Sequence, residues 1–221
     1  MVPTVDHNVL STLSDDDRRA VLATMVRRRY RKGETLFHEG ETGDLLYVLE
    51  RGRVAIRVST SLGDVATLIV LGPGASFGEQ ALLDHGSTVR TASAVALEPV
   101  EARTLQRQHF DDLRRLHPSV DRMLVEALAA QVRRLSTHLV EALYSPVEVR
   151  LVRRLAEVAM LYGDSGPIEI PLRQDDLASM AGTTRPTANR VLRQLEDDGI
   201  VALRRGTLQV LDAASLAARA R

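Results

Sequence analysis

The chain has 221 residues, with 29 basic and 29 acidic side chains and no cysteine. This length suggests two modest domains or one large one. The absence of cysteine excludes disulfides, thiolate zinc sites, iron–sulfur clusters and cysteine nucleophiles, and it fits a reducing compartment. The longest charge-free run, Val65–Gly78, is too short to span a bilayer. The first residues are acidic rather than basic, so we expect no secretory signal and a cytoplasmic protein.

The segment from about residue 31 to residue 101 consists of short apolar stretches separated by glycines. Strands are expected at 45–49, 54–58, 65–71 and 92–97, with turns at Gly33, Gly40, Gly43, Gly52, Gly63, Gly72 and Gly74. Short strands with turn residues at intervals of roughly ten residues are typical of a β-sandwich or β-barrel. The sequence therefore predicts a β-rich N-terminal domain.

A long helix is predicted from Pro118 to Leu143, where apolar residues recur in alternating steps of three and four. These a and d positions of a heptad repeat are Val125, Leu128, Val132, Leu135, Leu139 and Ala142. One alternative is an amphipathic helix that lies on its own domain. A narrow apolar stripe over this length is more typical of a helix that pairs with a second copy, so we expect a homodimer. Pro146 is expected to end the helix.

The final third begins with a predicted helix at 147–162 and a strand at 168–172. Two short helices follow, and Gly182 permits the tight turn between them. The second begins at Arg185 after a capping hydroxyl from Thr183 or Thr184, and its apolar positions Ala188, Val191, Leu192 and Leu195 face the core. A helix-turn-helix inserts the start of its second helix into the major groove, where arginine binds guanine. The residues expected to contact DNA are Thr184, Arg185, Pro186, Thr187, Asn189, Arg190 and Arg193.

A β-hairpin is predicted after Gly199, and its tip contains Arg204 and Arg205. Two arginines at a hairpin tip suit a wing that contacts phosphate. The alternative for this region is a solvated helix with ordinary surface arginines, but the turn glycine, the cap and the basic hairpin together favour DNA binding. The zero net charge does not exclude DNA, because it averages a local basic face with an acid-rich remainder.

A second group of residues, around Gly78, has the chemistry to bind a ribose phosphate. Gly78 lets the backbone approach a ligand, and the amides of Glu79, Gln80 and Ala81 can donate to an anion at the start of a short helix. Arg90 and Thr91 add a guanidinium and a hydroxyl, and the Glu79 carboxylate can accept from a sugar hydroxyl. The alternative is that Glu79 and Arg90 form a structural ion pair.

In this order, these features resemble the cyclic-AMP receptor protein (CRP/FNR) family of bacterial transcription regulators over nearly the whole chain. The matching motifs are Phe77–Leu82, Arg90–Ala92, Gly182–Thr187 with Arg190, and the opening strands at 33–37 and 43–48. The resemblance implies an α+β fold in three parts. These are a cyclic-nucleotide-binding β-roll (jelly roll) at 1–117, a dimerisation helix and hinge at 118–145, and a winged helix-turn-helix at 146–221.

The resemblance also assigns roles to single residues of the ligand site. In family members that bind nucleotides, Glu79 would hold the ribose 2′-hydroxyl, and Arg90 with Thr91 would hold the cyclic phosphate. A Thr-Ser pair on the dimerisation helix usually meets the purine, partly across the dimer. That pair falls on Leu135-Ser136 or, shifted by one, on Ser136-Thr137. We therefore assign Ser136 and Thr137 to the site, with ordinary helix surface as the alternative.

The chain departs from the family pattern where the recognition helix begins. The usual Arg-Glu-Thr reads Arg185-Pro186-Thr187, so the carboxylate that accepts from cytosine is missing and that base should be read differently. We expect no metal, haem or iron–sulfur cluster. His7, His38, His85, His109, His117 and His138 form no ligand pattern and are expected at the surface. No two of them have the spacing of a cupin-like metalloenzyme, so we expect no enzyme.

The function expected from these assignments is a homodimeric, ligand-gated transcription regulator that binds a palindromic operator in double-stranded DNA. The effector is a cyclic nucleotide, cyclic AMP ahead of cyclic GMP, and RNA polymerase is a further candidate partner. Ligand binding would rotate the DNA-binding domains about Tyr144–Pro146 and place the recognition helices about 34 Å apart. The alternative is a regulator of the same fold that binds DNA without ligand or senses another effector.

Overall fold

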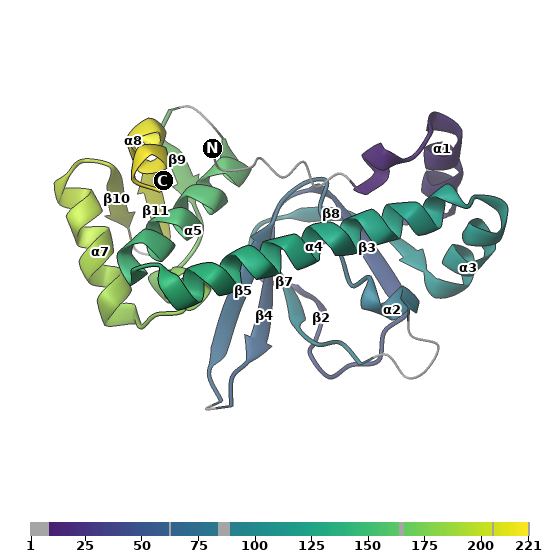
Figure 1. The fold of residues 1–221 in the computed structure, drawn as a ribbon, viewed down its shortest axis with the longest axis horizontal. Coiled ribbons are helices and arrows are strands. Elements are labelled where there is room, and N and C mark those ends of the chain that lie inside the picture. The colour runs from purple at the N-terminus through teal and green to yellow at the C-terminus, as the bar shows by residue number, and fades with distance from the viewer. Residues whose placement is uncertain (1–8, 62, 84–88, 164–165, 205, 221) are drawn as a thin grey trace. The chain divides into compact units, whose positions relative to one another are not determined.

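The computed structural model describes residues 9–61, 63–83, 89–163, 166–204 and 206–220 (Figure 1). Within them the chain forms two compact units. The N-terminal unit contains the residues up to Ser59 and Leu71–Leu135, and the C-terminal unit contains Thr60–Val70 and the residues from Ser136 onward. The long helix α4 (Ser119–Tyr144) therefore contributes to both units. The predicted domain limits at residues 117 and 145 stay predictions.

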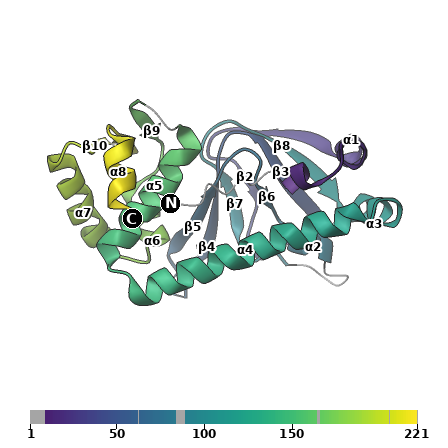
Figure 2. The same cartoon turned by 45° about the horizontal axis from the view of Figure 1, so that its top comes forward.

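The sheets of the N-terminal half have four strands each, and Figure 2 shows these strands gathered into one β-roll. The first sheet has the order β1-β8-β3-β6 and the second the order β2-β7-β4-β5. Side chains alternate between the two faces of a strand, and β8 buries Val100, Ala102 and Thr104 in this way. The strands are β1 (Val26–Tyr30), β2 (Thr35–Phe37), β3 (Leu45–Arg51), β4 (Val54–Ser59), β5 (Val65–Leu71), β6 (Ser76–Phe77), β7 (Ser93–Ala96) and β8 (Val100–Gln106).

Short helices pack with the first turns of α4 on this roll and form its main apolar core. Phe110 of α3 is fully buried, and Val120 and Met123 of α4 are almost as inaccessible. Residues of β3, β8 and α1 complete the cluster. The helices are η1 (Val9–Thr12), α1 (Asp15–Thr24), α2 (Gln80–Leu83) and α3 (Arg107–Leu116).

A carboxylate in α1 fastens that helix to the start of α4. The Ser119 hydroxyl donates to Asp17 Oδ2 at 2.5 Å, and His117 Nδ1 lies 2.6 Å from Asp17 Oδ1. These hydrogen bonds, first the one from Ser119 and then the one from His117, hold the pKa of Asp17 below its ordinary value of 3.8. The ionised carboxylate is therefore the form that stabilises the fold.

We expect the Asp17→Asn variant to be less stable than the unmodified protein at pH 7, with a smaller difference at acidic pH. A carboxyl group with a lowered folded-state pKa stabilises the fold fully above its unfolded-state pKa, and this contribution is lost as the pH falls through the folded-state pKa. Urea unfolding at pH 7 and pH 3 measures the effect. Asp16→Asn is the matched control, because Asp16 is highly exposed and pairs with Arg19 of the same helix. An Asp17→Asn effect of equal size at both pH values would contradict the assignment.

Helix α4 leaves most of its predicted heptad stripe uncovered in the single chain. Val125, Val132 and Leu139, at three successive a positions, are 63, 61 and 60% exposed. Leu135 and Ala142 at d positions are also exposed, whereas Leu128 is half-buried against the core cluster. A soluble helix seldom leaves a continuous apolar stripe in water. Burying these exposed apolar side chains would require a partner surface.

The C-terminal unit contains a small sheet surrounded by helices. The sheet has the order β10-β11-β9, with β10 (Val201–Arg204) and β11 (Thr207–Val210) forming an antiparallel hairpin and β9 (Ile168–Ile170) beside them. The predicted inward positions Ala188, Val191, Leu192 and Leu195 are buried. The helices, all labelled in Figure 2, are α5 (Val147–Tyr162), α6 (Gln174–Met180), α7 (Arg185–Asp197) and α8 (Ala213–Arg219).

The predicted α+β fold class is confirmed, with β5 and α5 bounded as expected from the sequence. The surface assignment of the histidines is wrong for two of them. His117 is half-buried on Asp17, and His138 is half-buried with its Nε2 against the Arg154 guanidinium. Polar partners far away in the sequence compensate for this burial. His38 and His109 are exposed, while His7 and His85 lie outside the described residues.

Candidate ligand site and DNA interface

Arg90 lies in a slot inside the β-roll and is only 7% exposed. Its Nη2 donates to the Leu45 carbonyl at 2.8 Å and its Nη1 to the Gly78 carbonyl at 3.3 Å. The guanidinium carbon lies 4.2 Å from the centroid of the Phe37 ring, within the range of a cation–π contact. The Tyr47 ring centroid lies 5.8 Å from the same carbon, so the guanidinium is held by two backbone acceptors and two aromatic rings.

Two glycines make room for this guanidinium. A Cβ at Gly43 would lie 2.6 Å from Arg90 Cζ, and a Cβ at Gly78 would lie 2.6 Å from Arg90 Nη1 and 3.0 Å from the Leu45 carbonyl. Gly78 also has a φ of +79°, which favours glycine. Sequence reasoning assigned Gly78 to the site and missed Gly43 and Phe37, because neither belongs to a local phosphate-binding motif.

One donor of the buried guanidinium has no partner among the described residues. Arg90 Nε is inaccessible to solvent and donates no hydrogen bond. Burial lowers the pKa of Arg90, while the nearby Tyr47 and Asp44 act in the opposite direction. Burial also raises the pKa of Tyr30 to about 12 and raises that of Tyr47. A buried cation with an unused donor is a site that fits an anionic ligand.

The predicted ligand-binding segment at 78–81, the cassette, has residues of unequal exposure. Glu79 is buried and Gln80 is exposed, with the Thr91 hydroxyl 3.4 Å from Gln80 Oε1. The predicted amide donors are not equally available, because the Ala81 amide donates to the Gly78 carbonyl at 3.1 Å. The alternative of a Glu79–Arg90 ion pair is not the arrangement found, since Arg90 donates to carbonyls instead. Ser136 and Thr137 are both exposed on α4.

The predicted base-reading arginines lie on the exposed side of α7. Arg185 and Arg190 are 69% and 70% exposed. Arg185 Nε is 3.4 Å from Asp175 Oδ1, and Arg190 Nη2 donates to Glu148 Oε1 at 2.9 Å. Exposed ion pairs of this kind contribute little to stability and exchange readily for other anions. Both guanidinium groups are therefore accessible to DNA.

The position predicted for the N-cap of α7 is correct, but the predicted capping hydrogen bond is absent. Thr184 occupies the N-cap position, but its hydroxyl makes no capping hydrogen bond and instead lies 3.1 Å from the Thr187 hydroxyl. Pro186 sits in the first turn, where its missing N–H costs nothing. Asn189 is half-buried, and its amide donates to Gln174 Oε1 of α6, so this side chain braces the two helices.

The hairpin of β10 and β11 is fastened to the recognition helix by one carboxylate. Glu196 Oε1 accepts from the Leu203 amide at 2.8 Å, and Glu196 Oε2 accepts from Arg193 Nη1 at 2.6 Å. These hydrogen bonds, with the one from Leu203 first, lower the pKa of Glu196. Arg204 ends β10 as an exposed residue, whereas Arg205 lies outside the described residues. The arrangement supports the predicted wing.

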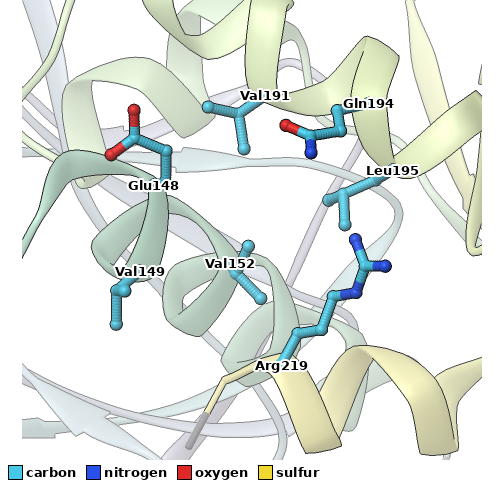
Figure 3. Close-up of a pocket in the computed structure, with 7 residues that line it drawn as sticks. All are labelled: Glu148, Val149, Val152, Val191, Gln194, Leu195 and Arg219. Carbon is cyan, nitrogen blue, oxygen red and sulfur yellow. The ribbon is translucent and has the colours of Figure 1, made fainter. Parts of the chain in front are cut away.

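A hollow of about 320 Å³ lies between α5, α7 and α8 of the C-terminal unit. Its apolar residues are Val149, Val152, Val191 and Leu195, and Figure 3 shows Glu148 and Arg219 on opposite sides of them. Glu148 and Arg219 already pair with Arg190 and Asp198. In the parts of the chain that the structure describes, no group of three potential metal ligands occurs, and no helix is long and apolar enough for a membrane span.

Two family models match the chain in the order that the structure shows. The cyclic nucleotide-binding domain matches residues 27–117, and the Crp-like helix-turn-helix domain matches residues 149–219. The first covers the β-roll with Arg90, and the second covers α5, the helix-turn-helix and the wing. The protein is therefore a DNA-binding transcription regulator with a cyclic nucleotide-binding domain, and not an enzyme.

Known proteins resemble the chain along most of its length. The "Cyclic AMP receptor protein" of Thermus thermophilus is 37% identical over 92% of both chains, and a "CRP-like cAMP-activated global transcriptional regulator" of Mycobacterium tuberculosis is 30% identical over 86% of both. The crystal structure of the Thermus thermophilus catabolite activator protein, 33% identical, matches with a TM-score of 0.56 and covers 96% of this chain and 98% of that one. The chain belongs to the cyclic-AMP receptor protein (CRP/FNR) family.

Proposed function

We propose that the chain is a cytoplasmic, homodimeric regulator whose binding to a palindromic operator is controlled by a cyclic nucleotide, cyclic AMP ahead of cyclic GMP. The observation behind the ligand assignment is the buried Arg90 guanidinium, which lies beside Gly78 and Glu79 and retains an unpartnered donor. RNA polymerase is a further partner in this proposal. The names of the two relatives, which refer to cyclic AMP, support the choice of effector.

The residues of the site fit the parts of a cyclic nucleotide. Arg90, with Thr91 and the amides of Glu79 and Gln80, would hold the phosphate, and the Glu79 carboxylate would accept from the ribose 2′-hydroxyl, while the Ala81 amide already donates to the Gly78 carbonyl. Each Nη group of Arg90 carries two N–H groups and donates to one carbonyl, so the guanidinium keeps donor capacity for a phosphate. Ser136 and Thr137 are exposed on α4 beside the heptad stripe, and in this proposal they would contact the base.

Calorimetric titration of the purified protein with cyclic AMP and cyclic GMP tests the ligand assignment. We expect heat of binding with both and the tighter dissociation constant for cyclic AMP. Gel-shift titration of an operator, obtained by selection from random duplexes, then measures DNA affinity with and without the nucleotide. Binding of neither nucleotide would overturn the assignment. Equal operator affinity in the two states would favour the ligand-independent alternative.

The dimer is tested by placing a charge in the heptad stripe. Val132→Asp should convert a dimer into a monomer, because an aspartate at a central a position buries an unpaired charge in the seam. Analytical ultracentrifugation measures the mass. Val140→Asp is the matched control, because Val140 is 57% exposed on the same helix but lies at a b position, outside the stripe. A dimeric Val132→Asp protein, or equal loss in both variants, would contradict pairing through this stripe.

A further inference from the structure

Arg150 of α5 connects three backbone carbonyls that belong to two separate segments of the C-terminal unit. Its Nη1 donates to the Ser145 carbonyl at 2.8 Å, its Nε to the Ala181 carbonyl at 2.9 Å and its Nη2 to the Gly182 carbonyl at 3.3 Å. Ser145 follows the last residue of α4, while Ala181 and Gly182 form the turn of the helix-turn-helix. One guanidinium therefore bridges the end of the predicted dimerisation helix and the turn before the recognition helix.

These carbonyls are the groups that need a donor at this place. The last carbonyls of a helix have no intrahelical partner, and they form the negative end of its dipole. Arg150 supplies a cation and several N–H groups to the C-terminal ends of both α4 and α6. Gly182 has a φ of +61°, which favours glycine, and a Cβ there would lie at an ordinary contact distance of 4.0 Å from Arg150 Nη2. The turn thus has its direction fixed by a side chain from a third helix.

A neighbouring arginine on the same helix makes a different connection. Arg153 Nη1 donates to Glu141 of α4 at 3.1 Å, and its Nε donates to the Ala220 carbonyl beyond α8 at 2.8 Å. Arg153 thereby joins α4 and α5 to the end of the chain. Like Arg150, it is a half-buried arginine that donates to a backbone carbonyl, which makes it a matched comparison for the contacts of Arg150 with the turn.

We propose that Arg150 is a positioning residue for DNA recognition, which holds α7 at the angle needed for base reading and transmits displacement of Ser145 to the turn. The Arg150 guanidinium contacts both Ser145 and the turn directly, so the coupling needs no further residues between them. The part of the proposal that concerns ligand rests on the proposed cyclic-nucleotide control. The part that concerns base reading depends only on the DNA-binding class of the protein.

The first experiment measures dissociation constants for the selected operator and for a scrambled duplex of equal length. We expect Arg150→Ala to bind the operator at least tenfold more weakly and the scrambled duplex less than twofold more weakly, because phosphate contacts tolerate a misplaced helix better than base contacts do. Arg150→Lys, which can restore one of the three hydrogen bonds, should fall between. Arg153→Ala should keep the operator-to-scrambled ratio of the unmodified protein even if its thermal midpoint falls.

An unchanged ratio in Arg150→Ala, or equal weakening on both duplexes, would overturn the positioning role. If Arg150→Ala does not fold, the same ratio measured on Arg150→Lys decides the question.

The second experiment repeats the operator titration with cyclic AMP. Arg150→Ala should bind cyclic AMP as the unmodified protein does but show a smaller ligand-induced gain in operator affinity. If the unmodified protein shows no gain, the proposed ligand control fails, while the ratio still tests Arg150.

Discussion

Arg90→Ala is expected to weaken cyclic nucleotide binding by about two orders of magnitude. A hydrogen bond to a charged group contributes roughly 1.5–3 kcal/mol, and about 1.4 kcal/mol corresponds to a tenfold change in affinity. The guanidinium is the charged donor next to the cassette, and it is held in place by carbonyls, by Phe37 and by the space at Gly43. Calorimetric titration with cyclic AMP measures the loss directly.

Two controls separate this effect from damage to the fold. Arg90→Lys keeps the charge but not the planar fork, so it should bind the nucleotide more weakly than the unmodified protein and more tightly than Arg90→Ala. Affinity for a scrambled duplex should stay the same in both variants, because the helix-turn-helix belongs to the C-terminal unit. Identical nucleotide affinity in Arg90→Ala and the unmodified protein would remove Arg90 from the site.

The contacts of Arg90 also show why the sequence predicts the ligand-binding motif but not the side-chain contacts within it. The motif around Gly78 and Arg90 is local, and glycine with a positive φ can be inferred from the turn that it must form. Apart from the Gly78 carbonyl, the guanidinium is contacted by Phe37, Gly43 and Leu45, which lie more than forty residues earlier. Only the pairing of distant strands brings these residues together. A motif therefore identifies the charge, and the fold determines what it contacts.

The same distinction separates the elements that were predicted from those that were not. Helix α5 and the heptad stripe of α4 follow from apolar periodicity, which is a property of neighbouring residues. Strand β1 has three exposed arginines and little apolar alternation, and it is a strand because it pairs along its length with β8. Helices α1 and α3 were likewise not predicted. Their burial depends on Phe110, Leu113 and Val21 meeting the core cluster rather than on a strong local pattern.

The side chains of the recognition helix show a third kind of difference. Asn189 is predicted to contact DNA, and this stays a prediction, but in the structure its amide donates to Gln174 of α6. The N-cap hydroxyl of Thr184 was expected from residue preference, yet it pairs with Thr187. Residue type and spacing predict which groups face outward, whereas hydrogen-bond choice among several polar neighbours depends on angles that a sequence does not specify. Arg185 and Arg190 are both exposed, and base reading by them stays a prediction.

Arg190→Ala is expected to cost about 1–3 kcal/mol on the selected operator and to relax preference at one base position. The reason is that a bidentate guanidinium discriminates guanine from the other bases, whereas alanine leaves that position unread. Arg185→Ala should behave in the same way at a second position. Both side chains give up only an exposed ion pair when DNA arrives. Quantitative gel shifts on operators with single base changes measure the loss and its position.

Arg193 provides the matched contrast, because it lies further along α7 and pairs with Glu196 beside the wing. Arg193→Ala should weaken binding to all duplexes to a similar extent and reduce the salt dependence by about one phosphate contact, the behaviour of a backbone-contacting residue. If the Arg190→Ala variant selects duplexes with the same consensus sequence as the unmodified protein, Arg190 does not read a base. Pro186 stands where the family has a carboxylate that accepts from cytosine. The base between those contacted by Arg185 and Arg190 should therefore be the least constrained position of each half-site. Pro186→Glu should restore a preference for cytosine at that position.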